Sequence, residues 1–322
     1  MFEDLHLGAI VVSTIRNAPV LIFAAMAGLF AERSGVIDLA LEGKMLASAF
    51  ASAGVAFATQ NVWYGIAAGM AVSSALALIQ GFVSITQKGN QLVGGIAINI
   101  AMSGLTFVLA EYFFHQGGQT PNLGEVRLAE IVLPGAAVIK DVPFLGWFYG
   151  SVIGGHTILV YLAFALIPLV HWVIYHSRFG LRLRACGENP HAADAAGVNV
   201  EGTRYMAMFI AGVLCSFSGA YISIVQSGFF LRDMTAGMGY LALTAMVFGN
   251  WRPKFTALGC LMFGFFSAVQ IQIEGVDLPV VGRIPGSLIQ MIPYVVTVIV
   301  LAGLMAKSVA PKSIGQPFVK SR

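Results

Sequence analysis

The stretch LRLRACGENPHAADAAGVNV, residues 181–200, is a polar segment that separates two long apolar parts of the chain. Asn189 can accept a hydrogen bond from a backbone N–H of a first helical turn, and Pro190 suits the first helical position. The alanines that follow favour about two turns of helix, and Gly197 can take the left-handed conformation that ends them. The stretch therefore predicts a short helix, which is either an ordinary capped turn or a docking helix for a partner. Such a helix needs packing from its own domain or from another protein.

The composition of the whole chain indicates what surrounds this helix. Of the 322 residues, 57% are hydrophobic and 10% are charged, whereas soluble domains carry about 25% charged residues. We therefore predict an all-α polytopic membrane protein with the short helix outside the lipid. The three cysteines, Cys186, Cys215 and Cys260, form no disulfide framework and suit apolar packing.

A helix crosses a bilayer with about 20 apolar residues, and the sequence contains about nine such segments. The first is interrupted at Arg16, Asn17 and Pro19. The seventh is short and contains glycines, for which a re-entrant half-helix would be natural, but the placement of basic residues favours a crossing, whether continuous or broken. A further crossing within residues 116–155 stays open, so the expected range is eight to ten. The segments cover approximately residues 8–30, 40–58, 62–85, 91–113, 156–176, 204–227, 234–250, 254–274 and 287–306.

The placement of Lys and Arg predicts the orientation, because these residues concentrate on the cytoplasmic side of a membrane. With nine crossings, Lys88, the Arg252 and Lys254 turn, residues 178–203 and residues 307–322 all fall on that side. The loop 114–155 carries more acidic than basic residues and belongs outside, as does the N-terminus. We therefore expect one transmembrane domain over residues 1–322, with an external loop, a cytoplasmic loop and a cytoplasmic tail at these positions. The basic residues of the cytoplasmic loop and tail are Arg178, Arg182, Arg184, Lys307, Lys312, Lys320 and Arg322.

The sequence lacks the patterns of several catalytic sites. It has no His-Glu-x-x-His metal motif, no Gly-x-Ser-x-Gly nucleophile elbow and no Gly-x4-Gly-Lys-Ser/Thr phosphate loop. His171 and His176 are five residues apart, which misses the spacing of metal ligands on one helix face. We therefore expect no catalytic residues, no metal and no cofactor in this chain.

The polar residues expected deep in the membrane are uncharged, while carboxylates such as Asp38 and Glu42 fall near the ends of predicted spans. Ion-coupled carriers place ionisable groups in the spans, so neutral side chains suit a neutral polyhydroxylated solute instead. Hydrogen bonding between helices is the alternative reading of the same residues. The candidates for a substrate pathway are Asn17, Asn99, Ser103, Gln226 and Thr244. A passive channel and a subunit driven by a partner both fit this pattern.

Three stretches resemble one family of membrane proteins. The polar segment from Gly180 to Val200 resembles the cytoplasmic coupling segment of ATP-binding cassette (ABC) importer permeases of the ribose/branched-chain amino acid type. AERSGVIDLALEGKML, residues 31–46, looks like the family's signature after the first span, and TAGMGYLALTAMVFGNWRP, residues 235–253, looks like its second-half signature. Asp38 and Ala40 depart from the family's usual residues. The length and the GNWRP form most resemble the shorter permease of nucleoside, or simple sugar, importers.

This resemblance implies a permease subunit in a bacterial plasma (inner) membrane that passes nucleosides or related sugars. It implies as partners an ABC ATPase that hydrolyses the ATP, a second and longer permease, and an external substrate-binding protein or lipoprotein, with no nucleic acid. The alternative is a self-sufficient channel or secondary carrier for a neutral polar solute. The residues expected to contact the ATPase are Arg184, Gly187, Glu188, Asn189, Pro190, Ala193 and Gly197.

Overall fold

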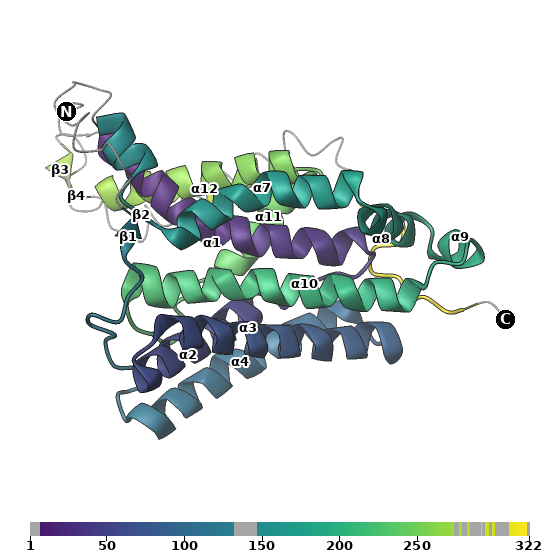
Figure 1. Ribbon diagram of the computed structural model, residues 1–322, viewed down its shortest axis with the longest axis horizontal. Coiled ribbons are helices and arrows are strands. Elements are labelled where there is room, and N and C mark those ends of the chain that lie inside the picture. Colours follow the sequence, from purple (N-terminus) through teal and green to yellow (C-terminus); the bar gives the residue numbers. More distant parts are fainter. Residues whose placement is uncertain are drawn as a thin grey trace.

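The computed structural model describes residues 7–131, 147–273, 277–278, 282–283, 291, 294–295, 298–299 and 309–320. Long helices run side by side along the longest dimension of the molecule (Figure 1). They are α1 (Leu7–Arg33), α2 (Leu41–Thr59), α3 (Val62–Gly81), α4 (Gln91–Phe114), α7 (Ile158–His176), α10 (Val200–Ala220) and α12 (Pro253–Ile273). The shorter helices are α8 (Arg178–Glu188), α9 (Pro190–Ala195) and α11 (Met238–Phe248).

Several π-helical and β segments complete the described chain. The π-helices η1 (Phe82–Thr86) and η3 (Tyr221–Ser227) extend α3 and α10, and η2 (Phe148–Ile153) precedes α7. The strand β1 (Glu130–Ile131) pairs antiparallel with β2 (His156–Thr157), and β3 (Asp277–Leu278) pairs antiparallel with β4 (Gly282–Arg283).

Six of the described helices are long and apolar enough to cross a membrane. This confirms an α-helical, multi-pass membrane protein, but it does not confirm nine crossings. The predicted span 287–306 and residues 132–146, where a tenth crossing could lie, fall wholly or largely outside the described residues. The sequence boundaries agree within a few residues elsewhere, because each apolar run ends at a polar or helix-breaking residue.

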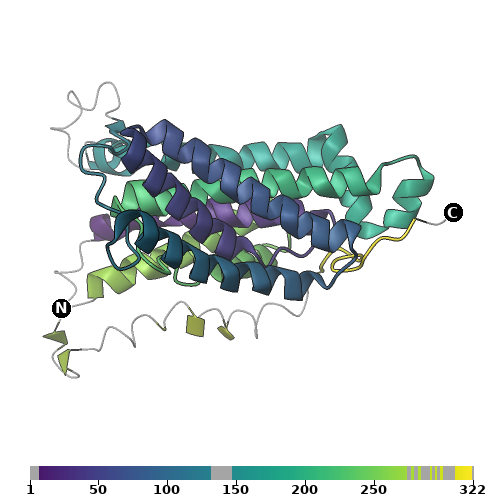
Figure 2. The same ribbon diagram turned by 90° about the horizontal axis from the view of Figure 1, so that it is seen from below.

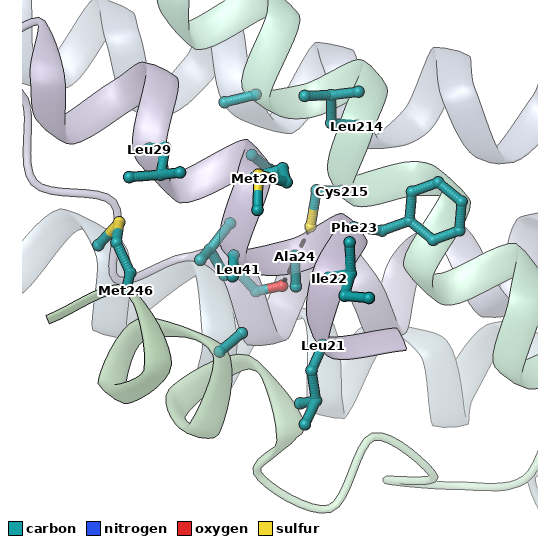
Figure 3. Packing of buried hydrophobic residues seen from close by; sticks show 14 of the residues in the cluster. Leu21, Ile22, Phe23, Ala24, Met26, Leu29, Leu41, Leu214, Cys215 and Met246 are labelled. Carbon is teal, nitrogen blue, oxygen red and sulfur yellow. Dashed lines mark hydrogen bonds between the residues drawn. The ribbon is translucent and has the colours of Figure 1, made fainter. Parts of the chain in front are cut away.

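Helix α1 lies at the centre of the packing, with α7, α10, α11 and α12 around it. Its side chains meet Leu41 of α2, Leu214 of α10 and Met246 of α11 in one apolar cluster (Figure 3). Within this cluster the Cys215 thiol lies 3.5 Å from the Leu41 carbonyl oxygen. The run of α1 from Ala18 to Ala31 is buried throughout.

The prediction of an interrupted first span was wrong, since α1 continues through Pro19. A proline within a helix frees backbone groups in the preceding turn, and in a membrane these must find partners from neighbouring helices. The Arg16 carbonyl oxygen accepts hydrogen bonds from the Tyr221 hydroxyl at 2.8 Å and from Gln226 Nε2 at 3.3 Å. Side chains of η3 therefore stabilise α1 beside its proline.

Small residues let α2, α3 and α10 approach closely. A Cβ atom added to Gly65 or Gly69 of α3 would collide with Ser52 of α2. Gly219 of α10 lies in the same way against Met45 and Ser48 of α2. The small-xxx-small pattern of residues 65–69 therefore marks a real helix contact, as such patterns do in other membrane bundles.

Two non-helical segments enter the bundle, at residues 34–40 and 228–237. Glu42, in the first turn of α2, joins them: its carboxylate accepts hydrogen bonds from Thr235 Oγ1 at 2.6 Å, from Gly237 N at 2.8 Å and from Gly239 N at 2.7 Å. A carboxylate at this position satisfies the free N–H groups at the start of α11 and complements its dipole.

The seventh predicted segment, residues 234–250, forms the short helix α11 and the non-helical residues around it. Gly228 pairs with Leu123 of the loop after α4, at one end of the bundle. Trp251, just after α11, accepts hydrogen bonds from Arg33 at the other end. The chain therefore passes from end to end through a non-helical stretch followed by the 11-residue helix α11.

Candidate functional site: an exposed helix and a polar cavity

The short helix α9 forms as its sequence predicts. Asn189 Oδ1 accepts a hydrogen bond from Ala192 N at 3.0 Å, and Pro190 occupies the first turn. The helix ends before Gly197, whose φ is +84°. Local capping therefore determines α9, and it stands at the extreme end of the molecule (Figures 1 and 2).

The polar loop contains a second helix that the sequence analysis did not predict. Helix α8 occupies residues 178–188 directly after α7, and Ser177 Oγ caps it by accepting a hydrogen bond from Gly180 N at 2.9 Å. Its apolar residues Leu183 and Cys186 are buried. The apolar residues Phe179, Leu183 and Cys186 recur at the helical spacing i, i+4 and i+7, and this is the signal that could have predicted an amphipathic helix.

The residues expected to contact an ATPase divide into two groups. Gly187, Pro190 and Ala193 are buried against the protein itself, and a Cβ atom on Gly187 would collide with the Arg33 carbonyl. Arg184 is half-buried, while Glu188, Asn189 and Gly197 are exposed. The exposed face of α9 also presents His191 and Ala192, which the sequence analysis did not single out.

Residues 309–320 pack against α8 and α9 and hydrogen-bond to the end of α8. Ser313 donates from its backbone N–H to the Gly187 carbonyl at 2.9 Å and from its hydroxyl to the Glu188 carbonyl at 3.2 Å. The Phe318 side chain is buried with Cys186, Ala193 and Val200. Burial raises the pKa of the Cys186 thiol, so this cysteine is protonated near neutral pH and suits packing.

The segments that carry the basic residues expected on one side of the membrane lie together at this end. Arg33 donates a hydrogen bond to the Trp251 carbonyl, beside Arg252. In the same turn, Asn250 Oδ1 accepts a hydrogen bond from Val309 N at 3.0 Å. Residues 309–320 therefore contact both this turn and α8. Thr86, two residues before Lys88, lies 2.6 Å from the Tyr205 hydroxyl near the start of α10. The β1–β2 pair lies at the opposite end (Figure 1).

An uncharged cavity of about 370 Å³, lined by apolar side chains and a few amides and hydroxyls, lies among α1, η3, α11 and α12. Two of the predicted pathway residues meet there, because Gln226 Nε2 lies 3.3 Å from Asn17 Oδ1. The sequence analysis missed Ser267, Gln270 and Tyr294, which also face this cavity. All of its lining residues are uncharged: Asn17, Val20, Leu21, Gln226, Ala236, Met238, Leu241, Gly264, Ser267, Gln270, Ile271 and Tyr294.

The other predicted pathway residues lie elsewhere. Asn99 binds three groups at 2.8 Å, the Gly43 N–H, the Leu39 carbonyl and the Tyr240 hydroxyl. Its amide is therefore occupied in holding the start of α2 against α4 and α11. Ser103 donates to Asp233 at 2.6 Å, and Thr244 donates to the Tyr240 carbonyl within its own helix at 2.9 Å.

A buried ion pair is the polar feature that the sequence analysis did not find. Lys44 Nζ lies 2.6 Å from Asp38 Oδ1, both side chains are fully buried, and Gln80 Oε1 lies 3.4 Å from the same nitrogen. The sequence placed Asp38 near a membrane boundary, yet the segment 34–40 folds inward between α1 and α2. The sequence signal for this pair was the presence of two opposite charges, Asp38 and Lys44, six residues apart at the start of the apolar segment of α2.

The sequence of this chain is similar to one family model and to several known proteins. The family model described as "Branched-chain amino acid transport system / permease component" matches residues 10–301. The nucleoside ABC transporter permease protein NupC of Lactococcus lactis is 33% identical over 311 residues, 94% of each chain. The guanosine ABC transporter permease protein NupQ of Bacillus subtilis is 33% identical over 322 residues, 98% of each chain. A putative glucose ABC transporter permease protein of Haloferax volcanii is 33% identical over 267 residues, 83% of this chain and 78% of the other.

Proposed function

Because the chain belongs to the family of permease components of branched-chain amino acid transport systems, matched over residues 10–301, we propose that it forms the membrane pathway of an ATP-driven importer for nucleosides or related simple sugars. The observation that carries this proposal is the near full-length similarity to nucleoside and guanosine permeases. The exposed helix α9 supplies the element that a subunit driven from outside would need.

The uncharged cavity supports a neutral solute. Amides and hydroxyls of Asn17, Gln226, Ser267 and Gln270 line it beside apolar side chains, which is the mixture typical of small-molecule sites. Nucleosides and glucose are both neutral and carry several hydroxyl groups, and the relatives are named for a nucleoside, guanosine and glucose. The cavity volume of about 370 Å³ is within the usual range for such ligands.

The partners in this proposal are an ABC ATPase, a second and longer permease, and an external substrate-binding protein or lipoprotein. ATP hydrolysis belongs to the ATPase, which docks on the exposed residues Glu188, Asn189, His191 and Ala192 of α8 and α9. This end of the molecule, with residues 178–203 and 307–322, faces the cytoplasm of a bacterial plasma membrane, since its basic residues follow the positive-inside tendency. The loop 114–155 then faces outward.

The first experiment is co-purification of the tagged chain from its native membrane in a mild detergent, with partners identified by mass spectrometry. We expect an ABC ATPase and a second permease. The complex is then reconstituted in vesicles, and uptake of radiolabelled guanosine and glucose is measured with and without ATP. Uptake by the chain alone, without ATP or partners, would instead establish a self-sufficient channel or carrier.

A further inference from the structure

A basic pocket of about 430 Å³ lies at the α8 end of the molecule, where α1, α7, α8 and the start of α12 meet. It is separate from the uncharged cavity and shares no residue with it. We call the following set the basic pocket: Arg33, His171, Tyr175, Arg184, Glu188, Arg252, Lys254 and Phe255.

The basic pocket carries a clear excess of positive charge. Arg33, Arg184, Arg252 and Lys254 contribute four cations, against the single carboxylate of Glu188. The described parts of the chain contain three ion pairs, at Arg16–Glu130, Lys44–Asp38 and Arg232–Asp233, and none involves these four cations. Like charges held together in this way repel one another, so an anion in the pocket would be stabilising.

The arginines are held in place by the protein. Arg33 donates from Nε and Nη2 to the Trp251 carbonyl at 2.9 and 2.7 Å, and Nη2 also reaches the Tyr175 hydroxyl at 3.3 Å. The Arg184 guanidinium stacks over the Tyr175 ring, 5.0 Å from its centre. Arg184 Nε is buried and has no hydrogen-bond partner among the described residues, an arrangement that costs free energy unless an acceptor binds.

The rim of the basic pocket continues into an apolar surface along two helices. On α7, Leu169 and Trp172 expose 52% and 58% of their surface, and on α12, Phe255 and Leu258 expose 55% and 64%. Helices α7 and α12 contact each other, and both are long and apolar enough to cross a membrane. The pocket therefore lies where spans end, with cations at the level of a lipid headgroup and hydrocarbon-facing side chains beyond them.

We propose that the basic pocket binds the phosphate of an anionic phospholipid, whose acyl chains lie along the exposed apolar faces of α7 and α12. Basic pockets between spans at the cytoplasmic side are the usual geometry for such headgroups. A lipid fits better than an acidic segment of a partner, because Arg33, Arg252 and Lys254 adjoin the apolar spans, while α9 extends beyond α8 at the tip (Figure 1). Only Arg184 and Glu188 belong both to the pocket and to the proposed ATPase contact. The bound lipid would connect α1, α7, α8 and the turn after α11. The proposal depends only on the chain crossing a membrane and not on the solute or on ATP.

Native mass spectrometry of the purified complex in detergent, titrated with phosphatidylglycerol, tests this site. The test variant is Arg252→Gln/Lys254→Gln. The control is Arg178→Gln/Arg182→Gln, which removes the same charge from exposed α8 residues outside the pocket. A basic residue near an anionic lipid surface strengthens binding about fivefold, so we expect the dissociation constant to rise about 25-fold in the test variant. The control should change it by less than about threefold, since exposed charges are screened.

Further measurements distinguish an anionic phospholipid in the pocket from inorganic phosphate and from a segment of a partner protein. Phosphatidylcholine should not replace phosphatidylglycerol, and millimolar inorganic phosphate should not displace it, because neither combines negative charge with acyl chains. Equal loss in both double variants, or displacement by inorganic phosphate, would overturn the lipid site. Lipid binding by the isolated chain that disappears in the complex with its partners would also overturn it, since the partner would then occupy the pocket.

Discussion

At the scale of single residues, Asp38 and Lys44 form an ion pair inside the bundle. Both side chains are completely buried, and removing one charge of such a pair leaves the other without compensation. We expect Asp38→Leu or Lys44→Met alone to destabilise the protein by about 3–5 kcal/mol. The double variant should recover most of that loss, because replacing both charges with apolar groups of similar size is often neutral.

Thermal unfolding of the three variants in detergent, followed by loss of the monodisperse peak, measures this effect. Arg232→Leu is a suitable control, since Arg232 pairs with Asp233 at an exposed site and such pairs contribute about 0–1 kcal/mol. A double variant as unstable as the two single ones added together would show that the pair has no mutual dependence.

Asn189 offers a second prediction at the residue scale, because its side chain caps α9. Asn189→Ala should weaken the helix by about 1 kcal/mol and lower solute-stimulated ATPase activity in the reconstituted complex. Asn189→Ser retains a capping oxygen and should retain most of the activity. If the alanine and serine variants lose activity equally while the complex stays assembled, the amide itself and not the cap is what the ATPase needs.

At the scale of elements, the positions of α8 and α9 depend on their contacts with residues 309–320. Phe318 fills the space beneath both helices beside Cys186. We expect Phe318→Ala to raise the rate at which N-ethylmaleimide labels Cys186 by at least about tenfold, because a lost phenyl ring in a core costs several kcal/mol.

The neighbouring residue provides the control for this experiment. Val319 is exposed, and Val319→Ala should leave the labelling rate unchanged. Cys215 and Cys260 are buried within the spans and should stay unlabelled in both variants, which isolates the signal from Cys186. Unchanged labelling of Cys186 in Phe318→Ala would mean that the tail segment does not support α8.

At the scale of the whole molecule, the solute pathway is tested through the uncharged cavity. Gln226→Leu removes an amide from its lining, and we expect the KM for guanosine uptake to rise about fivefold, the factor that corresponds to one hydrogen bond of about 1 kcal/mol. Gln119→Leu, at an exposed position in the loop after α4, should leave KM unchanged. An unaltered KM in Gln226→Leu would remove this cavity from the pathway.

The sequence predicted the parts of this fold that depend on neighbouring residues. The cap at Asn189, Pro190 and Gly197 determined α9, and apolar runs located most long helices. It did not predict the parts that depend on distant contacts. Glu42 receives its partners from residues 235–239, almost 200 positions later, and the helix through Pro19 relies on Tyr221.

The same reasoning explains the mixed outcome for the pathway residues. Polarity inside a span indicated that Asn17, Gln226 and Asn99 would need partners, but not which kind of partner. Asn17 and Gln226 face a cavity, whereas Asn99 is used in binding the start of α2. Only the three-dimensional packing separates these two roles.

The position of residues 313–318 has a consequence for how the protein is made. These residues complete the surface formed around Gly187 and Glu188, which are about 125 positions earlier in the chain. A ribosome therefore synthesises α8 and α9 well before the segment that holds them. A partner that binds this surface, as proposed above, would therefore meet the finished site only after residues 313–318 have been synthesised.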